Sequence, residues 1–137
     1  MNDATTLADR YVAVWNEPDT ETRRAGVRAL WTDDASHTVQ PPQDVRDAAV
    51  ALGVAVDLEA RGHEALEERV TKSHDEFVGR GGFVFRPAGD AARLRDMVKF
   101  RWEMVPRDGG DVAGRGLQVV VLDADGRIRL DYQFIES

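Results

Sequence analysis

Apolar and polar positions follow helical spacing over the first part of the chain. Residues 3–16 carry apolar side chains three or four positions apart, which predicts an amphipathic helix. Asn16 and Pro18 follow as stop signals, and Asp19 is a suitable N-cap for a second helix over residues 19–31. The apolar sides of these helices are formed by Leu7, Tyr11, Val14 and Trp15, and by Val27, Leu30 and Trp31.

The segment from residue 36 to the double glycine at 81–82 contains three different patterns of apolar and polar positions. Residues 36–40 alternate like a short strand that ends before the prolines at 41–42. Residues 43–55 predict a short helix rich in alanine and valine. A firmer helix is predicted over residues 61–82, with one face formed by Leu66, Val70, His74 and Phe77.

Four strand-like runs fill the rest of the chain. Glycine, proline and aspartate clusters separate them, and they cover residues 83–89, 93–106, 111–123 and 127–137. Helices followed by a run of strands predict an α+β fold, in which a curved antiparallel sheet wraps around three to four N-terminal helices. No linker or repeat interrupts the pattern, so we expect residues 1–137 to form a single domain.

Composition excludes several classes of function. The 137 residues include 25 acidic and 18 basic ones, and the resulting net charge of −7 argues against a nucleic-acid partner. There is no cysteine, so neither a disulfide nor a thiolate metal site is available. The N-terminus lacks the features of a signal peptide, and no run approaches the ~20 apolar residues of a membrane span. We therefore expect a cytoplasmic protein that does not contact membranes.

The three histidines do not form a metal-binding pattern. They lack the i, i+4 spacing of a helical metal pair, so we expect no metal. His74 is expected to be a hydrogen-bonded core residue, and His63 a solvated residue at a helix start. His37 shares a strand face with Val39. No nucleotide-binding loop or nucleophile elbow occurs, and we expect no cofactor.

Three stretches in this order carry a family resemblance. They are "RYVAVWNEPD" at the start, "LWTDDASHTV" after the second helix and "LDADGRI" before the last strand. Together they resemble the nuclear transport factor two-like superfamily, which includes SnoaL-like proteins, ketosteroid isomerase and limonene epoxide hydrolase. The resemblance implies a cone-shaped α+β barrel with an apolar pocket between helices and sheet, which is usually dimeric through the outer face of the sheet.

The two best-known relatives suggest site residues by position. The oxyanion-hole tyrosine of ketosteroid isomerase falls on Tyr11, its oxyanion-hole aspartate on Gln118 and its general base near Val39. The Asp-Arg-Asp set of the epoxide hydrolase falls on Phe100, Trp102 and Gln133, so that triad is missing. Tyr11 and Gln118 are therefore expected to stabilise negative charge on a substrate oxygen.

Strand alternation predicts which side chains face the pocket. Val98, Phe100 and Trp102 form an apolar face that should point inward. On the last strand the family resemblance selects Asp131, while hydrophobicity alone favours the opposite face. We follow the resemblance and assign Ile128, Leu130, Tyr132 and Phe134 to a dimer interface or a second core layer. The expected walls of the substrate pocket are Trp15, Trp31, His37, Val39, Val98, Phe100, Trp102, Gln133 and Ile135.

Asp131 is the leading catalytic candidate. In an apolar cavity its pKa would be raised by desolvation, which would suit proton transfer near neutral pH. SnoaL-like polyketide cyclases work in a similar way, without a metal. The alternative is a surface aspartate that pairs with Arg127 or Arg129.

The sequence thus supports one main functional hypothesis and two alternatives. The main one is a cofactor-free acid/base enzyme, of the cyclase, isomerase or dehydratase type, that acts on a small apolar carbonyl-bearing molecule. The alternatives are a non-catalytic small-molecule-binding protein and a dimeric interaction module of the same fold.

Overall fold

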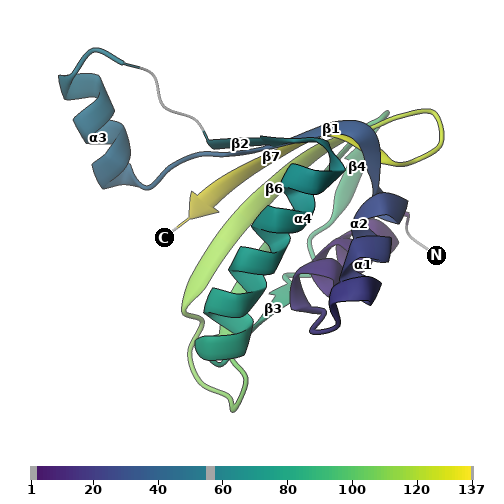
Figure 1. The fold of residues 1–137 in the computed structure, drawn as a ribbon, viewed down its shortest axis with the longest axis horizontal. Coiled ribbons are helices and arrows are strands. Elements are labelled where there is room, and N and C mark those ends of the chain that lie inside the picture. Colours follow the sequence, from purple (N-terminus) through teal and green to yellow (C-terminus); the bar gives the residue numbers. More distant parts are fainter. Residues whose placement is uncertain (1–2, 55–57, 137) are drawn as a thin grey trace.

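The computed structural model describes residues 3–54 and 58–136 and contains a seven-stranded sheet with helices on one side (Figure 1). The helices are α1 (Asp3–Asn16), α2 (Thr20–Leu30), α3 (Gln43–Ala51), α4 (Gly62–Ser73) and a π-helical continuation, η1 (His74–Arg80). The strands are β1 (Trp31–Val39), β2 (Leu58–Arg61), β3 (Phe83–Pro87), β4 (Ala92–Leu94), β5 (Met97–Pro106), β6 (Gly114–Leu122) and β7 (Ile128–Glu136). The α+β class predicted from the sequence is confirmed.

Local sequence signals explain the first two helices. α1 ends at Asn16, and α2 begins after Asp19, whose carboxylate accepts a hydrogen bond from the Thr22 backbone N–H at 2.9 Å. Arg23 is buried and donates to the Glu17 carbonyl at 3.0 Å and to the Thr71 hydroxyl of α4 at 3.0 Å. These bonds tie the α1–α2 turn to α4.

The strands follow the order β2-β1-β7-β6-β5-β3, and β4 pairs with β5 outside this path. β1 and β7 are parallel, whereas all the other paired strands are antiparallel. The sheet is therefore curved as expected, but it is mixed, because one of its strand pairs is parallel where antiparallel pairing was expected. Because two parallel strands need a long crossover connection, no local turn signal marks their pairing.

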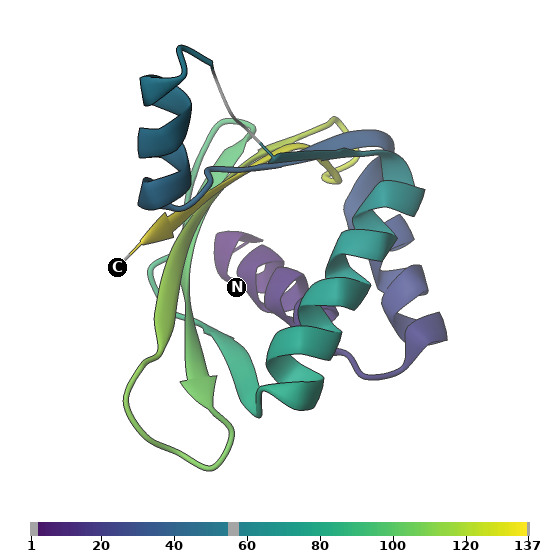
Figure 2. The same ribbon diagram turned by 60° about the vertical axis from the view of Figure 1, so that its left-hand side comes forward.

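The curved sheet holds α1 in its hollow, and α2 and α4 cover the open side (Figure 2). Apolar faces of these helices and of the central strands form one core, because each element must bury its apolar side against another. The largest buried side chains are Trp31, Phe100, Leu30, Leu66 and Ile128. No helix among the described residues is long and apolar enough to cross a membrane.

Several element boundaries differ from the sequence prediction. β1 begins at Trp31, directly after α2, and β2 was not predicted. The run over residues 93–106 is two strands, because a tight turn with Arg95 at φ 55° separates β4 from β5. The helix predicted over residues 43–55 ends at Ala51, and its last predicted residue lies outside the described residues.

α3 stands apart from the rest of the molecule (Figure 1). Only Ala49 of this helix is buried, whereas Val45 and Val50 are exposed. α3 is therefore not one of the helices that the sheet encloses.

An irregularity in β7 changes which of its side chains face the core. The β6–β7 register pairs Leu122 with Ile128 and Val121 with Leu130, so Arg129 is an extra residue on β7. As a result, Ile128 and Asp131 both point inward although they differ in parity, and both are about 1% exposed or less. The prediction that Ile128 lies on the strand face opposite to Asp131, in a dimer interface or a second core layer, is wrong, because the bulge shifts the alternation by one residue.

Candidate functional site

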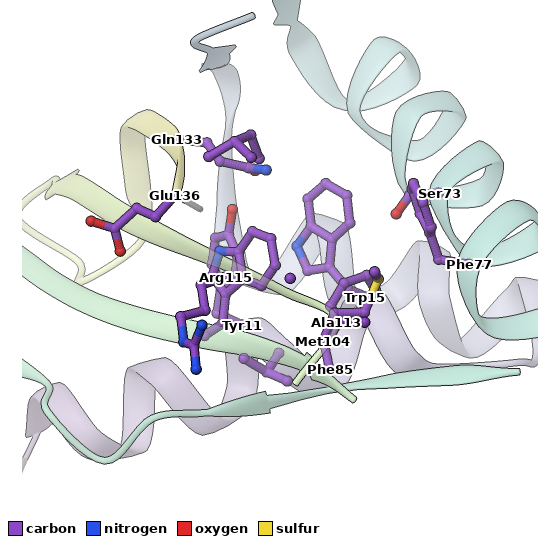
Figure 3. Close-up of a pocket in the computed structure, with 14 residues that line it drawn as sticks. Tyr11, Trp15, Ser73, Phe77, Phe85, Met104, Ala113, Arg115, Gln133 and Glu136 are labelled. Carbon is purple, nitrogen blue, oxygen red and sulfur yellow. The ribbon is translucent and has the colours of Figure 1, made fainter. Parts of the chain in front are cut away.

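A cavity of about 360 Å³ opens between α1, the end of α4 with η1, and the concave face of the sheet. Its walls are mostly apolar and aromatic. Figure 3 shows Tyr11, Trp15 and Gln133 directed toward this cavity from α1 and β7, with Ser73 and Phe77 closing it from the α4 side. The remaining walls are formed by Val12, Phe85, Trp102, Met104, Ala113, Gly114, Arg115, Ile135 and Glu136.

Asp131 lies directly behind this wall and is 1% exposed. Its Oδ2 accepts hydrogen bonds from the Tyr11 hydroxyl at 2.8 Å and from the Trp31 indole N–H at 3.1 Å. Its Oδ1 accepts a hydrogen bond from the Gln118 amide at 2.7 Å. A buried carboxylate needs such donors, and here α1, β1 and β6 each supply one.

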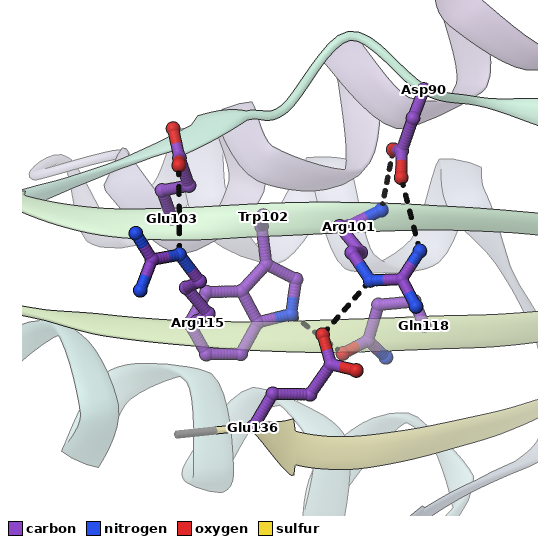
Figure 4. A network of polar contacts seen from close by, with 7 residues as sticks. All are labelled: Asp90, Arg101, Trp102, Glu103, Arg115, Gln118 and Glu136. Atoms are coloured by element: carbon purple, nitrogen blue, oxygen red, sulfur yellow. Dashed lines mark hydrogen bonds and ion pairs between the residues drawn. The ribbon is translucent and has the colours of Figure 1, made fainter. Parts of the chain in front are cut away.

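Gln118 belongs to the same hydrogen-bond network and contacts both Tyr11 and Asp131. Its amide nitrogen donates to the Tyr11 hydroxyl oxygen at 2.8 Å as well as to Asp131, which uses both amide hydrogens. Its carbonyl oxygen accepts from the Trp102 indole N–H at 2.9 Å, a contact drawn in Figure 4. The amide orientation of Gln118 is therefore fixed by partners on both ends.

Burial controls the titration of this network. Desolvation raises the pKa of Asp131, while the neighbouring His37 and the three donors oppose the shift. Desolvation, followed by the charge of Asp131, raises the pKa of Tyr11 well above its usual value. Tyr11 is consequently a phenol at neutral pH, and Asp131 is a stronger proton acceptor than an exposed carboxylate.

A second, partly buried chain of hydrogen bonds begins at Arg69 on α4. The Arg69 guanidinium lies 3.0 Å from Nδ1 of His37, and His37 Nε2 lies 2.9 Å from the side-chain oxygen of Gln133. Burial lowers the pKa of His37, although Asp131 opposes this shift. The parallel pairing of β1 with β7 places His37 beside Asp131 in the sheet, and so brings the two networks together.

Comparison with known proteins identifies the fold. Neither a protein-family model nor a curated protein matches the chain. A candidate isomerase of the SnoaL-like family from Agrobacterium tumefaciens strain C58 is 25% identical to it and has a TM-score of 0.78, with 100% of both chains covered.

Two further solved structures match over nearly the whole length. A SnoaL-like protein of unknown function from Burkholderia thailandensis is 12% identical, with a TM-score of 0.66 over 100% of this chain and 99% of that one. An NTF2-like protein of unknown function from Mesorhizobium loti is 17% identical, with a TM-score of 0.60 over 100% and 96%. The chain has the NTF2-like fold of SnoaL-like proteins. This confirms the resemblance predicted from the sequence.

The site residues predicted from the sequence fall into two groups, those that line the cavity and those that do not. Five of them line the cavity, namely Tyr11, Trp15, Trp102, Gln133 and Ile135. The others lie outside its wall. Six of them are buried in the interior, namely Asp131, Gln118, Trp31, His37, Val98 and Phe100, and Val39 is half-buried on β1. The catalytic and substrate-binding roles of these residues remain predictions.

Sequence reasoning missed two features of this NTF2-like site. Arg69 carried no signal, because a single arginine on a helix rich in charged residues resembles a solvated one. The cavity walls from Ser73 and Phe77 were also missed, although the apolar stripe that includes Phe77 was recognised. The alternative in which Asp131 is a surface residue paired with Arg127 or Arg129 is wrong, because Asp131 is buried and its partners are neutral.

Two histidines differ from expectation. His63 is half-buried and bonds through Nε2 to the Trp31 carbonyl at 2.8 Å, so it is not a solvated residue. His74 is buried, but neither of its ring nitrogens has a hydrogen-bond partner among the described residues. Within the same part of the chain, no group of three or more His, Asp or Glu side chains converges as metal ligands would.

The outer face of the sheet carries exposed apolar and charged side chains. Tyr132 and Phe134 are 40% and 39% exposed there. Arg101 pairs with Glu136 at 2.9 Å and with Asp90 at 3.4 Å, as Figure 4 shows. Arg101 therefore lies on the face of β5 opposite to the cavity.

Proposed function

We propose that this NTF2-like protein is a cofactor-free acid/base enzyme that moves a proton next to the carbonyl group of a small, largely apolar molecule. The proposal rests on the Tyr11–Asp131 pair. A phenol that lines the cavity donates its hydrogen, at 2.8 Å, to a carboxylate that is sealed from solvent. Such pairs of titratable groups with shifted pKa values are typical of acid/base sites.

Proton transfer in this arrangement runs through Tyr11, because Asp131 does not reach the cavity. The Tyr11 oxygen takes a proton from the carbon next to the substrate carbonyl, while the Tyr11 hydroxyl proton passes to Asp131 Oδ2. The substrate becomes an enolate, Asp131 becomes a neutral acid and Tyr11 is again a phenol. Return of the proton to another atom of the enolate completes the cycle, so charge and protons balance at each stage.

Enolate formation is a step shared by cyclisation, isomerisation and dehydration of carbonyl compounds, so the site is compatible with each of these reaction types. The apolar walls suit a substrate with fused or branched hydrocarbon rings. The similar Agrobacterium protein is a candidate isomerase of the SnoaL-like family, which supports an activity in this class.

Deuterium exchange tests the proposal without knowledge of the natural substrate. The protein is incubated with α-tetralone in D₂O, and uptake of deuterium at the carbon next to the carbonyl is followed by NMR. We expect the wild type to accelerate exchange, and Tyr11→Phe and Asp131→Asn to lower the rate by about 100-fold or more. Asp125→Asn, in an exposed turn, is the matched control. Exchange no faster than in buffer would overturn the proposal.

Ligand binding without turnover is the second candidate function. It is favoured by one observation: Asp131 already has donors on both oxygens and does not line the cavity. Binding of α-tetralone with no deuterium exchange would support this candidate. The interaction-module alternative is less well supported, because a cavity of about 360 Å³ exceeds the ~300 Å³ at which ligand sites begin.

A further inference from the structure

The three hydrogen-bond donors of Asp131 differ in what else they do. Tyr11 lines the cavity and gives up its hydroxyl hydrogen in the proposed proton transfer. Gln118 shares its amide hydrogens between Asp131 and Tyr11. The Trp31 indole N–H has one acceptor among the described residues, which is Asp131 Oδ2 at 3.1 Å. Trp31 is therefore the donor that serves Asp131 alone.

The Trp31 side chain is held by the core and not by a ligand. Trp31 is 0% exposed and does not line the cavity, although the sequence predicted it as part of the wall. Its backbone N–H donates to the Val27 carbonyl, and its backbone carbonyl is bonded to His63 Nε2 at 2.8 Å. Its ring packs against that of Tyr11, with the ring centroids 5.2 Å apart. The direction of the indole N–H is thus set by the folded chain.

Asp131 Oδ2 is the oxygen that receives a proton in the proposed transfer from Tyr11. While Asp131 is ionised, Oδ2 accepts hydrogen bonds from both Tyr11 and Trp31. Once Oδ2 carries a proton it is a weaker acceptor, so the Trp31 bond loses strength. A donor that binds the charged form more strongly favours that form, and Trp31 therefore opposes the effect of burial on Asp131.

We propose that Trp31 is a positioning residue for Asp131, whose indole N–H keeps the buried carboxylate ionised and holds Oδ2 against the Tyr11 hydroxyl. The catalytic consequence rests on the proposed function, whereas the effect on Asp131 can be measured without turnover. Buried indole N–H groups usually have an acceptor, so the alternative is a merely structural bond. The two roles differ in how Asp131 responds to pH when the N–H is removed.

Trp31→Phe removes the N–H and keeps an aromatic ring beside Tyr11. We expect the pKa of Asp131 to rise by about 1 in this variant, because a hydrogen bond to a charged group is lost. Carbon-13 NMR of the labelled aspartate carboxyl groups measures this pKa, and Asp131→Asn identifies the signal. The other titratable groups of the described residues that act on it are Tyr11 on α1, His37 on β1 and Arg69 on α4, and the variant leaves all three in place.

A neighbouring core residue provides the matched control. Ile128 pairs with Trp31 in the β1–β7 register and is also 0% exposed, and Ile128→Val removes a methyl group there but no donor. Both variants should lower the free energy of unfolding, but only Trp31→Phe should change the pKa of Asp131. Equal changes in both variants, or no change in Trp31→Phe, would overturn the positioning role.

A titration of the wild type covers the case in which Trp31→Phe does not fold. The indole proton resonance of Trp31 should move with the same midpoint as the Asp131 carboxyl carbon, because the bond weakens when Asp131 gains a proton. The resonance of Trp102, whose N–H is bonded to the Gln118 amide oxygen, should move much less. Trp15→Phe and Trp102→Phe assign the signals of the three tryptophans. A Trp31 resonance that does not follow Asp131 would contradict the proposal.

Deuterium exchange of α-tetralone separates this inference from the proposed function. Exchange requires ionised Asp131, so the acid side of the pH profile should move upward by about one pH unit in Trp31→Phe. A merely structural role would lower the rate at every pH and leave the profile in place. A raised pKa of Asp131 without any exchange refutes only the proposed enzyme, and exchange with an unchanged pKa refutes only this inference.

Discussion

Asp131 is the residue on which the chemistry of the cavity depends. It combines near-complete burial with three neutral donors, and no arginine or lysine of the described residues bonds to it. A carboxylate held in this way remains costly to ionise, because hydrogen bonds replace only part of the hydration it loses. That residual cost is the physical origin of its raised pKa.

The raised pKa of Asp131 predicts a pH dependence of stability. The folded state keeps the Asp131 proton at pH values where the unfolded chain, with an aspartate pKa of about 3.9, has released it. The stabilisation from this group is therefore complete below about pH 4 and is lost as pH rises through the folded pKa. Relative to Asp131→Asn, the wild type should lose free energy of unfolding over this window.

Urea unfolding of both proteins between about pH 4 and pH 7 measures this difference. Comparison with the variant cancels the contributions of other carboxylates. If the wild type instead gained stability relative to Asp131→Asn as pH rose, the three donors would outweigh burial and the direction of the pKa shift would be wrong.

Single residues also show the limits of prediction from sequence. The inward position of Asp131 followed from the family resemblance, whereas hydrophobic alternation alone argued against it. The bonds of Trp31 and Arg69 could not be predicted, because they join residues that are 100 and 32 positions apart from their partners. Such contacts depend on strand pairing, which residue types alone do not specify.

Among the elements, β6 illustrates how a small residue shapes the cavity wall. A Cβ atom on Gly116 would lie 2.1 Å from the Trp102 ring, whereas one on Gly114 would lie 3.5 Å from Met104. The absence of a side chain at Gly116 therefore lets the Trp102 indole lie across β6, where it lines the cavity and bonds to Gln118.

Substitution of Gly116 should disturb both stability and the cavity. We expect Gly116→Ala to lower the free energy of unfolding by about 1–3 kcal/mol, because Trp102 must move and the core is overpacked. Gly114→Ala is the matched control on the same strand and should be tolerated. Equal effects of the two substitutions in denaturant unfolding would contradict this account of Trp102.

The elements themselves were predicted with uneven success. α1 and α2 followed from apolar spacing and the Asp19 cap, since these signals are local. β2 is only four residues long and mostly exposed, and so it has no apolar pattern to recognise. The turn at Arg95 was missed because it lacks the glycine or asparagine that usually marks positive φ.

At the scale of the whole molecule, the outer face of the sheet carries a group of exposed and half-buried apolar side chains. We expect it to form a homodimer interface, because exposed Tyr132 and Phe134 lie among half-buried Leu117, Val119 and Leu130 there. Exposed apolar patches of this kind are typical of protein interfaces. The competing surface is formed by α3 and the residue that caps it, with Val50 and Leu52 at 78% and 77% exposure.

Two double variants separate these surfaces. We expect Tyr132→Glu with Phe134→Glu to convert a dimer to a monomer in sedimentation velocity, because charges would be desolvated at the interface. Val50→Glu with Leu52→Glu should leave the dimer intact. The reverse result would place the interface on α3, and a monomeric wild type would exclude both. Circular dichroism confirms that each variant is folded.

The architecture was predictable because helices followed by strands have few ways to bury their apolar faces. The strand order was not, since the parallel pairing of β1 with β7 joins segments about 90 residues apart, such as His37 and Asp131. That pairing brings the two hydrogen-bond networks of the site together.

The extra residue at Arg129 makes the start of β7 a place where chain length matters more than composition. Loss of one residue there would restore strict alternation and rotate either the isoleucine or the acid toward water, without changing either side chain. In natural or designed chains of the same fold, the presence or absence of this extra residue would therefore decide whether the acidic side chain points into the molecule or toward solvent. Comparisons of such chains should align this position by register and not by residue similarity.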